Sequence, residues 1–162
     1  MDIYLIRHAD AFRLGERGAT TDEERPLTEQ GEAQARRVGA GLERRGVRPA
    51  VVLTSPLVRA RQTADLVASQ WLAATPPVQN LKELTPGSKR RKLARALGDL
   101  AKDSVILVGH QPDLGEWAAW LIGSKKAQLD LAKAGVAHID CEGAPDKGKG
   151  TLRWLVPPEW LG

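Results

Sequence analysis

The chain has 162 residues, of which 42% are hydrophobic and 27% charged, and its formal net charge is +4. This composition excludes wholesale disorder, and the length fits one domain covering residues 1–162. No apolar run is long enough to span a bilayer, and the first one ends at Arg7, so we expect no membrane segment, no leader peptide and a cytoplasmic protein. The single Cys141 excludes an internal disulfide and fits a reducing compartment.

The N-terminal part alternates short apolar runs with a helical pattern. Residues 3–6 are continuously apolar, which is typical of a strand covered on both faces. Thr28 is the expected N-cap of the following helix, whose apolar residues recur at helical spacing and which stops near Gly46. Residues 51–53 then predict a second buried strand.

The second helix is expected to start directly after this strand. Ser55 and Pro56 are its predicted N-cap and first residue, since proline is favoured at the first helical position. Its apolar face continues at helical spacing to Trp71. Residues 78–81 form a short third strand, and residues 86–88 a turn.

The remaining elements follow the same alternation. Residues 93–100 predict an amphipathic helix, and residues 105–108 the clearest buried strand of the chain. A helix comes next, with Pro112 near its start and Gly123 past its end. Alternating residues 136–141 and the segment 151–156 then predict a hairpin joined by a loop rich in glycine.

Strands separated by helices indicate an α/β fold of three layers. We expect a mainly parallel sheet with helices on both faces, to which the C-terminal hairpin adds antiparallel strands. In such a sheet, ligands bind beyond the carboxyl ends of the strands. The residues that follow the strands are therefore the candidates for a functional site.

Polar side chains follow three of the predicted strands. Arg7 and His8 come after the first, Arg59 lies one helical turn beyond the second, and His110 follows the fourth. Arginine presents a planar fork of donors suited to phosphate, so these residues predict an anion site. A metal is disfavoured because the arginines would repel a cation and no set of ligands at metal spacing accompanies the histidines. A histidine that accepts a phosphoryl group and passes it to water is the alternative.

Several ordered motifs carry a family resemblance. Arg7-His8, the segment from Ser55 to Ala64 and Gly109-His110 resemble the histidine phosphatase superfamily, also called phosphoglycerate mutase-like. Within it, the sequence is most similar to the small SixA-type phosphohistidine phosphatases, through the segments at residues 7–11, 25–28, 83–86 and 109–112. The resemblance covers residues 1 to about 122 and implies the phosphoglycerate mutase-like fold.

The resemblance also implies roles for individual residues. His8 would be the phosphorylated nucleophile, with Arg7, Arg59 and His110 binding the phosphoryl group. Glu83 would be the proton donor. Asp10 is the reserve candidate for that role. The chemistry implied needs no metal and no cofactor.

Two expectations concern the surroundings of His8. The imidazole must be neutral to attack, so one ring nitrogen needs an acceptor, for which we expect a backbone carbonyl. Many family members have glycine directly after the nucleophile, whereas Ala9 stands here. Since alanine resists positive φ, the turn is expected to use ordinary backbone angles.

The substrate remains open between two classes. The chain is too short to fold inserted segments over the site, which favours a phosphorylated protein, and specifically protein phosphohistidine, over a small phosphomonoester. A mutase is less favoured. A non-enzymatic protein that binds nucleic acid through residues 89–92 and Arg95 is a third reading, but no nucleic-acid-binding signature supports it. Trp117 and Trp120 are expected either to pack or to line the mouth of the site.

Overall fold

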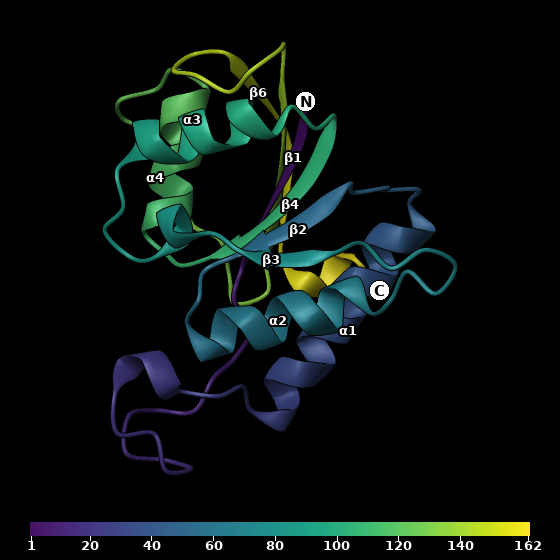
Figure 1. Ribbon diagram of the computed structural model, residues 1–162, viewed down its shortest axis with the longest axis vertical. Helices are drawn as coiled ribbons and strands as arrows, with labels where there is room; N and C mark the ends of the chain where they lie inside the picture. The colour runs from purple at the N-terminus through teal and green to yellow at the C-terminus, as the bar shows by residue number, and fades with distance from the viewer.

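Six strands form one sheet in the computed structural model, which describes residues 1–162 (Figure 1). The strand order is β3-β2-β4-β1-β5-β6. The first four strands are parallel, β5 pairs antiparallel with β1, and β6 pairs antiparallel with β5. The strands are β1 (Asp2–Arg7), β2 (Val51–Thr54), β3 (Val78–Asn80), β4 (Ser104–Gly109), β5 (Val136–Cys141) and β6 (Gly150–Val156). The predicted parallel sheet with a C-terminal hairpin is confirmed.

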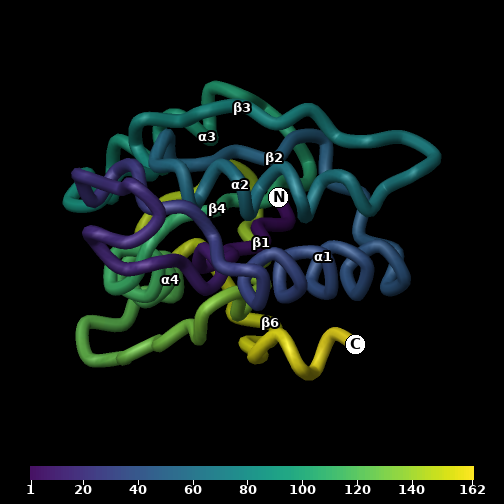
Figure 2. The backbone as a smooth tube through the Cα atoms, turned by 90° about the horizontal axis from the view of Figure 1, so that it is seen from below, coloured from purple at the N-terminus to yellow at the C-terminus, as the bar shows by residue number.

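Two helices cover each face of this sheet. The helices are α1 (Glu29–Arg44), α2 (Val58–Ala68), α3 (Arg90–Leu100) and α4 (Asp113–Leu121), with short 3-10 turns η1 (Asp22–Glu24), η2 (Lys82–Leu84) and η3 (Pro158–Trp160). Helices α1 and α2 lie side by side below the sheet, and α3 and α4 lie above it (Figures 1 and 2). The three-layer prediction is thus confirmed.

The side chains of β1 show how the two layers are built. Tyr4 and Ile6 belong to the core under α1 and α2, whereas Ile3 and Leu5 belong to the core under α3 and α4. Successive side chains of a strand point to opposite faces, so a strand covered on both sides must be apolar throughout. This is the physical reason for the uninterrupted apolar runs in the sequence.

The start of α1 packs directly on the segment that follows β1. Thr28 caps the helix, since its hydroxyl accepts from Gly31 N at 3.0 Å. A Cβ on Gly31 would lie 2.0 Å from the backbone oxygen of Asp10, so no larger residue fits here. The predicted cap is confirmed, and the glycine is explained by the close approach of the helix to the chain beyond His8.

The second helix differs from the prediction at both ends. It begins at Val58 with Leu57 as N-cap, so Ser55 is not the cap. It ends at Ala68. Trp71 lies beyond this end and is buried, and its indole N–H donates to Val47 O at 2.8 Å. The apolar spacing identified the buried side correctly but overestimated the length of the helix. No helix of the structure has the length and apolar character that crossing a membrane requires.

Candidate active site

The polar residues predicted at the strand ends come together at one edge of the sheet. Strands β2, β4 and β1 are neighbours, and His8 and His110 directly follow β1 and β4. Arg59, in the first turn of α2, reaches the same place. All three side chains are buried, with residue exposures of 9% for His8, 4% for His110 and 5% for Arg59. Burying three such groups together costs free energy, and clusters of this kind are typical of functional sites.

The imidazole of His8 is held in one orientation by two contacts. Its Nδ1 lies 2.8 Å from Ala9 O, so Nδ1 carries the proton and donates to this carbonyl. Its Nε2 is therefore the free nitrogen, and it accepts from Arg59 Nε at 3.2 Å. Burial, against the opposing effect of the Ala9 carbonyl and together with the charges of Arg59, Arg7 and Arg25, lowers the pKa of His8 to about 4. The ring is neutral at pH 7, and the expected backbone acceptor is found.

The turn after His8 is fixed by a threonine of α2. Ala9 N donates to Thr63 Oγ1 at 3.0 Å, and the Thr63 hydroxyl donates to Arg59 O at 2.7 Å. Ala9 is not among the residues with positive φ. Ordinary backbone angles at Ala9 are thus confirmed. Thr63 links the position of His8 to the helix that carries Arg59.

His110 faces His8 and is held by Ser55. The two imidazole rings have centroids 5.2 Å apart, and His110 Nε2 lies 2.9 Å from Ser55 Oγ. The Ser55 hydroxyl can donate its proton to His110 Nε2, and in that tautomer the ring proton of His110 lies on Nδ1. This Nδ1 is buried and has no hydrogen-bond partner in the protein. Burial lowers the pKa of His110 to about 3, with the neighbouring cationic charges adding to the effect.

Asp22 of η1 is a member of the site that the sequence analysis missed. Arg59 Nη1 donates to Asp22 O at 2.6 Å and Nη2 donates to Asp22 Oδ2 at 2.9 Å, so the outer edge of the guanidinium is occupied. Asp22 also accepts from Arg25 at 2.8 Å. The hydrogen bonds from Arg25 and Arg59 hold the pKa of Asp22 below its usual range. No local sequence signal marks Asp22, because its partner is 37 residues away.

Arg7 reaches the site from the end of β1 and keeps one donor free. Its Nη1 donates to Leu131 O at 2.8 Å, which fixes the side chain. Its Nε is buried and has no partner in the protein, as is true of His110 Nδ1. Buried N–H groups without a partner cost free energy, and clusters of them mark places where a ligand supplies the acceptor. With Arg59, these donors form a site for an anion.

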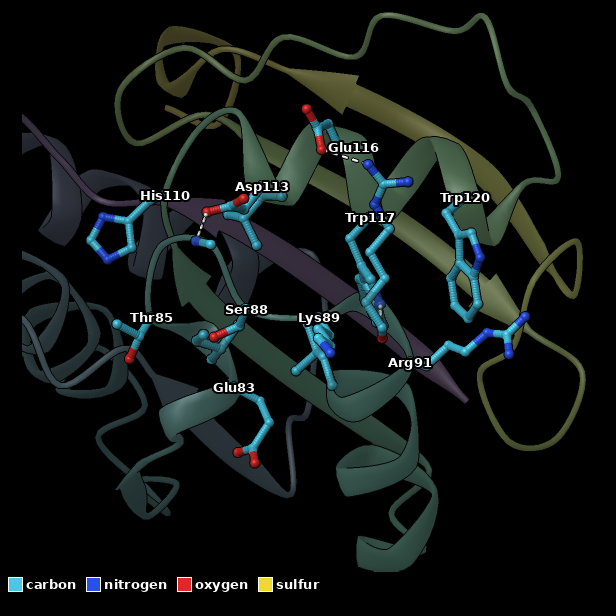
Figure 3. A pocket seen from close by; sticks show the side chains of 15 residues that line it. Glu83, Thr85, Ser88, Lys89, Arg91, His110, Asp113, Glu116, Trp117 and Trp120 are labelled. Atoms are coloured by element: carbon cyan, nitrogen blue, oxygen red, sulfur yellow. Dashed lines mark hydrogen bonds and ion pairs between the residues drawn. The ribbon is translucent and has the colours of Figure 1, made fainter.

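The two carboxylates considered as proton donors differ in placement. Glu83, in η2, lines a pocket of about 550 Å³ that His110 also lines, and it makes no hydrogen bond or ion pair (Figure 3). Asp10 instead binds Lys133 and accepts from Thr28 Oγ1 at 2.7 Å. Burial alone would raise the pKa of Asp10, but the contacts with Lys133 and Thr28 outweigh it and keep the pKa below its usual range. Of the two carboxylates, only that of Glu83 has no hydrogen bond or ion pair, and only Glu83 lines the pocket that His110 lines.

The pocket next to His110 lies between α4 and the segment from η2 to the start of α3. Trp120 lines its far end, opposite His110, together with Arg91 (Figure 3). Trp117 also borders it but is buried, with its indole N–H donating to Arg90 O at 3.1 Å. Trp117 thus packs, while Trp120 lines the end of the pocket away from His110. No group of three or more His, Cys, Asp or Glu side chains is placed to hold a metal ion.

Comparisons with known proteins agree with this geometry. Residues 3–100 match the family model described as histidine phosphatase superfamily (branch 1). An uncharacterised protein of Picosynechococcus sp. is 38% identical, with 99% of each chain covered. Phosphohistidine phosphatase SixA of Escherichia coli strain K12 is 29% identical over 98% of this chain and 94% of its own length.

Solved structures show the same fold. The protein histidine phosphatase SixA complexed with tungstate superposes with a TM-score of 0.84 and 27% identity, with both chains covered completely. The alpha-ribazole phosphatase from Shigella flexneri superposes with a TM-score of 0.74 and 23% identity over 98% of this chain and 97% of its own. The second likeness concerns the fold alone.

Proposed function

Because this chain belongs to the histidine phosphatase superfamily and is a phosphatase, we propose that it hydrolyses protein phosphohistidine through a phosphohistidine intermediate on His8. One observation carries the proposal. The neutral His8 ring donates from Nδ1 to Ala9 O and turns the lone pair of Nε2 toward Arg59, beside buried donors that have no partner. We also propose that residues 1–162 work as one domain.

In the first step, His8 Nε2 attacks the phosphorus of the substrate. A bond forms between Nε2 and phosphorus as the bond to the leaving imidazole breaks, and Glu83 supplies the proton that the leaving group needs. His8 keeps its proton on Nδ1, and the Ala9 carbonyl stabilises the positive charge that the ring gains. The dephosphorylated partner can then depart.

In the second step, water attacks the phosphorus and the bond to Nε2 breaks. The Glu83 carboxylate takes a proton from the water, and the products are inorganic phosphate and the original neutral His8. The oxygens that carry charge in both steps face Arg7, Arg59 and the Nδ1–H of His110. All these groups belong to the protein, so the proposed reaction uses no metal or cofactor.

The comparisons support the binding of an oxyanion by a protein of this fold. Tungstate is a tetrahedral oxyanion like phosphate, and it is present in the SixA structure that superposes over the whole chain. For Arg59 to turn its fork to such an anion, the hydrogen bond from Arg59 Nη2 to the Asp22 carboxylate must break. The side chain of Asp22 is half exposed, so it can move into solvent.

The choice of protein phosphohistidine rests on two supports. One relative that matches nearly the whole chain is named a phosphohistidine phosphatase. The site also opens beside His110 into the pocket that reaches Trp120, which leaves room for a side chain presented by another protein. Removal of phosphoryl groups from histidine would give the protein a role in signal transduction.

The test compares two substrates in the presence of EDTA. The purified protein is given a phosphohistidine-bearing protein and, separately, p-nitrophenyl phosphate, and release of phosphate is measured. We expect turnover of both, a clear preference for the phosphohistidine protein, and a loss of about a thousandfold or more in His8→Ala. Turnover of p-nitrophenyl phosphate alone would replace the proposed substrate by a small phosphomonoester. Turnover that persists in His8→Ala would contradict the intermediate.

A further inference from the structure

The pocket beside His110 has a wall of positive charge that the proposed chemistry does not use. Four consecutive basic residues begin α3, and all four are exposed: Lys89, Arg90, Arg91 and Lys92. The first turn of α3 contains no acidic residue to offset them. Such an arrangement is unfavourable for the helix, because the helix dipole is already positive at this end.

Some charged side chains of the pocket have ionic partners and others do not. Arg90 is paired with Glu116 at 2.5 Å, and the Asp113 carboxylate accepts from Gly87 N at 2.9 Å. Lys89 and Arg91 line the same pocket and make no ion pair. Glu83 lines the pocket too, without a partner, but it lies away from Arg91 and Trp120 (Figure 3). Along α3, Lys89 and Arg91 are therefore the cations that line the pocket without an ionic partner.

The pocket also offers an apolar surface. Trp120 is half-buried and lies at the end of the pocket opposite His110, next to Arg91 (Figure 3). An aromatic side chain beside cations suits a peptide that carries an apolar residue among carboxylates. The volume of about 550 Å³ accommodates a few side chains.

We propose that this pocket, between Lys89, Arg91 and Trp120, binds an acidic segment that flanks the phosphorylated histidine of the partner protein. The inference rests on the proposed function, because the pocket starts at His110 and a segment bound in it belongs to the molecule whose phosphoryl group is at His8. Charge complementarity selects the occupant. Opposite charges bring acidic partners to this wall and leave basic partners disfavoured.

The test uses two synthetic peptides that contain one phosphohistidine and differ only in their flanks. One carries three Asp or Glu residues and a leucine on one side, and the other carries Gln at the acidic positions. At low salt we expect kcat/KM to be about tenfold higher for the acidic peptide, as a pair of exposed ionic contacts would give. The advantage should shrink as salt is added.

A double variant assigns this preference to the pocket. Lys89→Glu/Arg91→Glu should abolish the advantage of the acidic peptide while leaving turnover of p-nitrophenyl phosphate unchanged. The matched control is Arg36→Glu/Arg37→Glu, which changes the charge equally on exposed positions of α1, on the other face of the sheet. The control should keep the advantage. Equal kcat/KM for the two peptides in the native protein would overturn the inference and leave the proposed function intact.

Binding without turnover keeps the inference separate from the reaction. The unphosphorylated acidic peptide, labelled with a fluorophore, should bind the native protein more tightly than the Gln peptide, and Lys89→Glu/Arg91→Glu should remove the difference. If the protein binds the acidic peptide in this way but does not turn over phosphohistidine, the proposed function is contradicted and the inference is not. A single-stranded oligonucleotide is the competing occupant. If it binds as tightly as the acidic peptide, and if Lys89→Glu/Arg91→Glu abolishes that binding, the proposal of an acidic protein segment is overturned.

Discussion

The floor of the active site and the wall of the pocket beside it are held in opposite ways. The floor consists of buried groups such as His8 and His110, each fixed by hydrogen bonds to other parts of the chain. The wall consists of exposed cations of α3, of which Lys89 and Arg91 have no ionic partner. The difference teaches that the catalytic groups belong to the sheet edge, where a substitution lowers the stability of the fold. The groups proposed to select the partner lie on a helix surface, where a substitution changes stability little.

The pH dependence of stability is the largest effect expected from the floor. Because the pKa of His8 is lowered from 6.5 to about 4 and that of His110 to about 3, the unfolded chain binds more protons than the folded protein below pH 6.5. The free energy of unfolding should therefore fall by about 4 kcal/mol from pH 7 to pH 5 for both imidazoles together. Denaturant unfolding at a series of pH values measures it.

The control for this prediction is His8→Asn, in which the fall should be about half as large. A stability that stays flat across this window in the native protein would show that the two imidazoles are not buried in their neutral forms. The floor and the wall would then not differ in the way described. Charge reversal at Lys89 and Arg91 should leave the pH dependence unchanged.

Arg59→Lys tests whether the floor needs a guanidinium or only a positive charge. Lysine keeps the charge but loses the Nε contact to His8 and the fork that reaches Asp22. We expect kcat to fall about a hundredfold with the fold intact, on the scale of losing one donor to a developing charge. Steady-state kinetics with circular dichroism as the check on folding would measure it. A rate within about threefold of the native value would show that the fork is dispensable.

Two glycine-to-alanine substitutions form a matched pair for measuring stability. In Gly31→Ala the new Cβ would meet the Asp10 backbone oxygen at 2.0 Å, so the turn beyond His8 must shift. We expect a loss of about 2 kcal/mol and reduced activity. In Gly98→Ala, inside α3, the nearest atom is 3.6 Å away, and the variant should be more stable by about 0.5–1 kcal/mol. Thermal or denaturant unfolding of both variants decides the comparison.

Asp22→Asn gives the smallest effect and concerns the outer edge of the floor, where Asp22 holds Arg59. The carboxylate competes with a bound anion for Arg59, so removing its charge should tighten inhibition by inorganic phosphate about two- to fivefold. Glu23→Gln is the control, since Glu23 is an exposed neighbour without an ion pair. Weaker inhibition in Asp22→Asn would instead show that Asp22 supports Arg59 in its working position.

The strands and the main site residues were predictable because their signals are local. Continuous apolar runs mark strands covered on both faces, and Arg7, His8 and His110 follow such runs directly. Thr28 was identifiable as a cap for the same reason. The placement of these residues at one edge then follows from the parallel sheet.

Other features depend on contacts between distant segments and could not be predicted. Ser55 before proline has the pattern of an N-cap, but its hydroxyl is bonded to His110, 55 residues away. Asp22 and Thr63 reach the site only because η1 and α2 pack beside His8, and the sequence around them gives no sign of it. The engagement of Asp10 by Lys133 was equally hidden.

The central claim is that His8 Nε2 carries the phosphoryl group during turnover. The direct measurement mixes the protein with a phosphohistidine substrate, stops the reaction within milliseconds in alkali, where phosphohistidine survives, and maps the modified residue by mass spectrometry and phosphorus NMR. Phosphate on Nε2 of His8, formed and lost at rates that match turnover, is the predicted result. Phosphate on His110, on Nδ1 of His8 or on no histidine at all during full turnover would contradict the account.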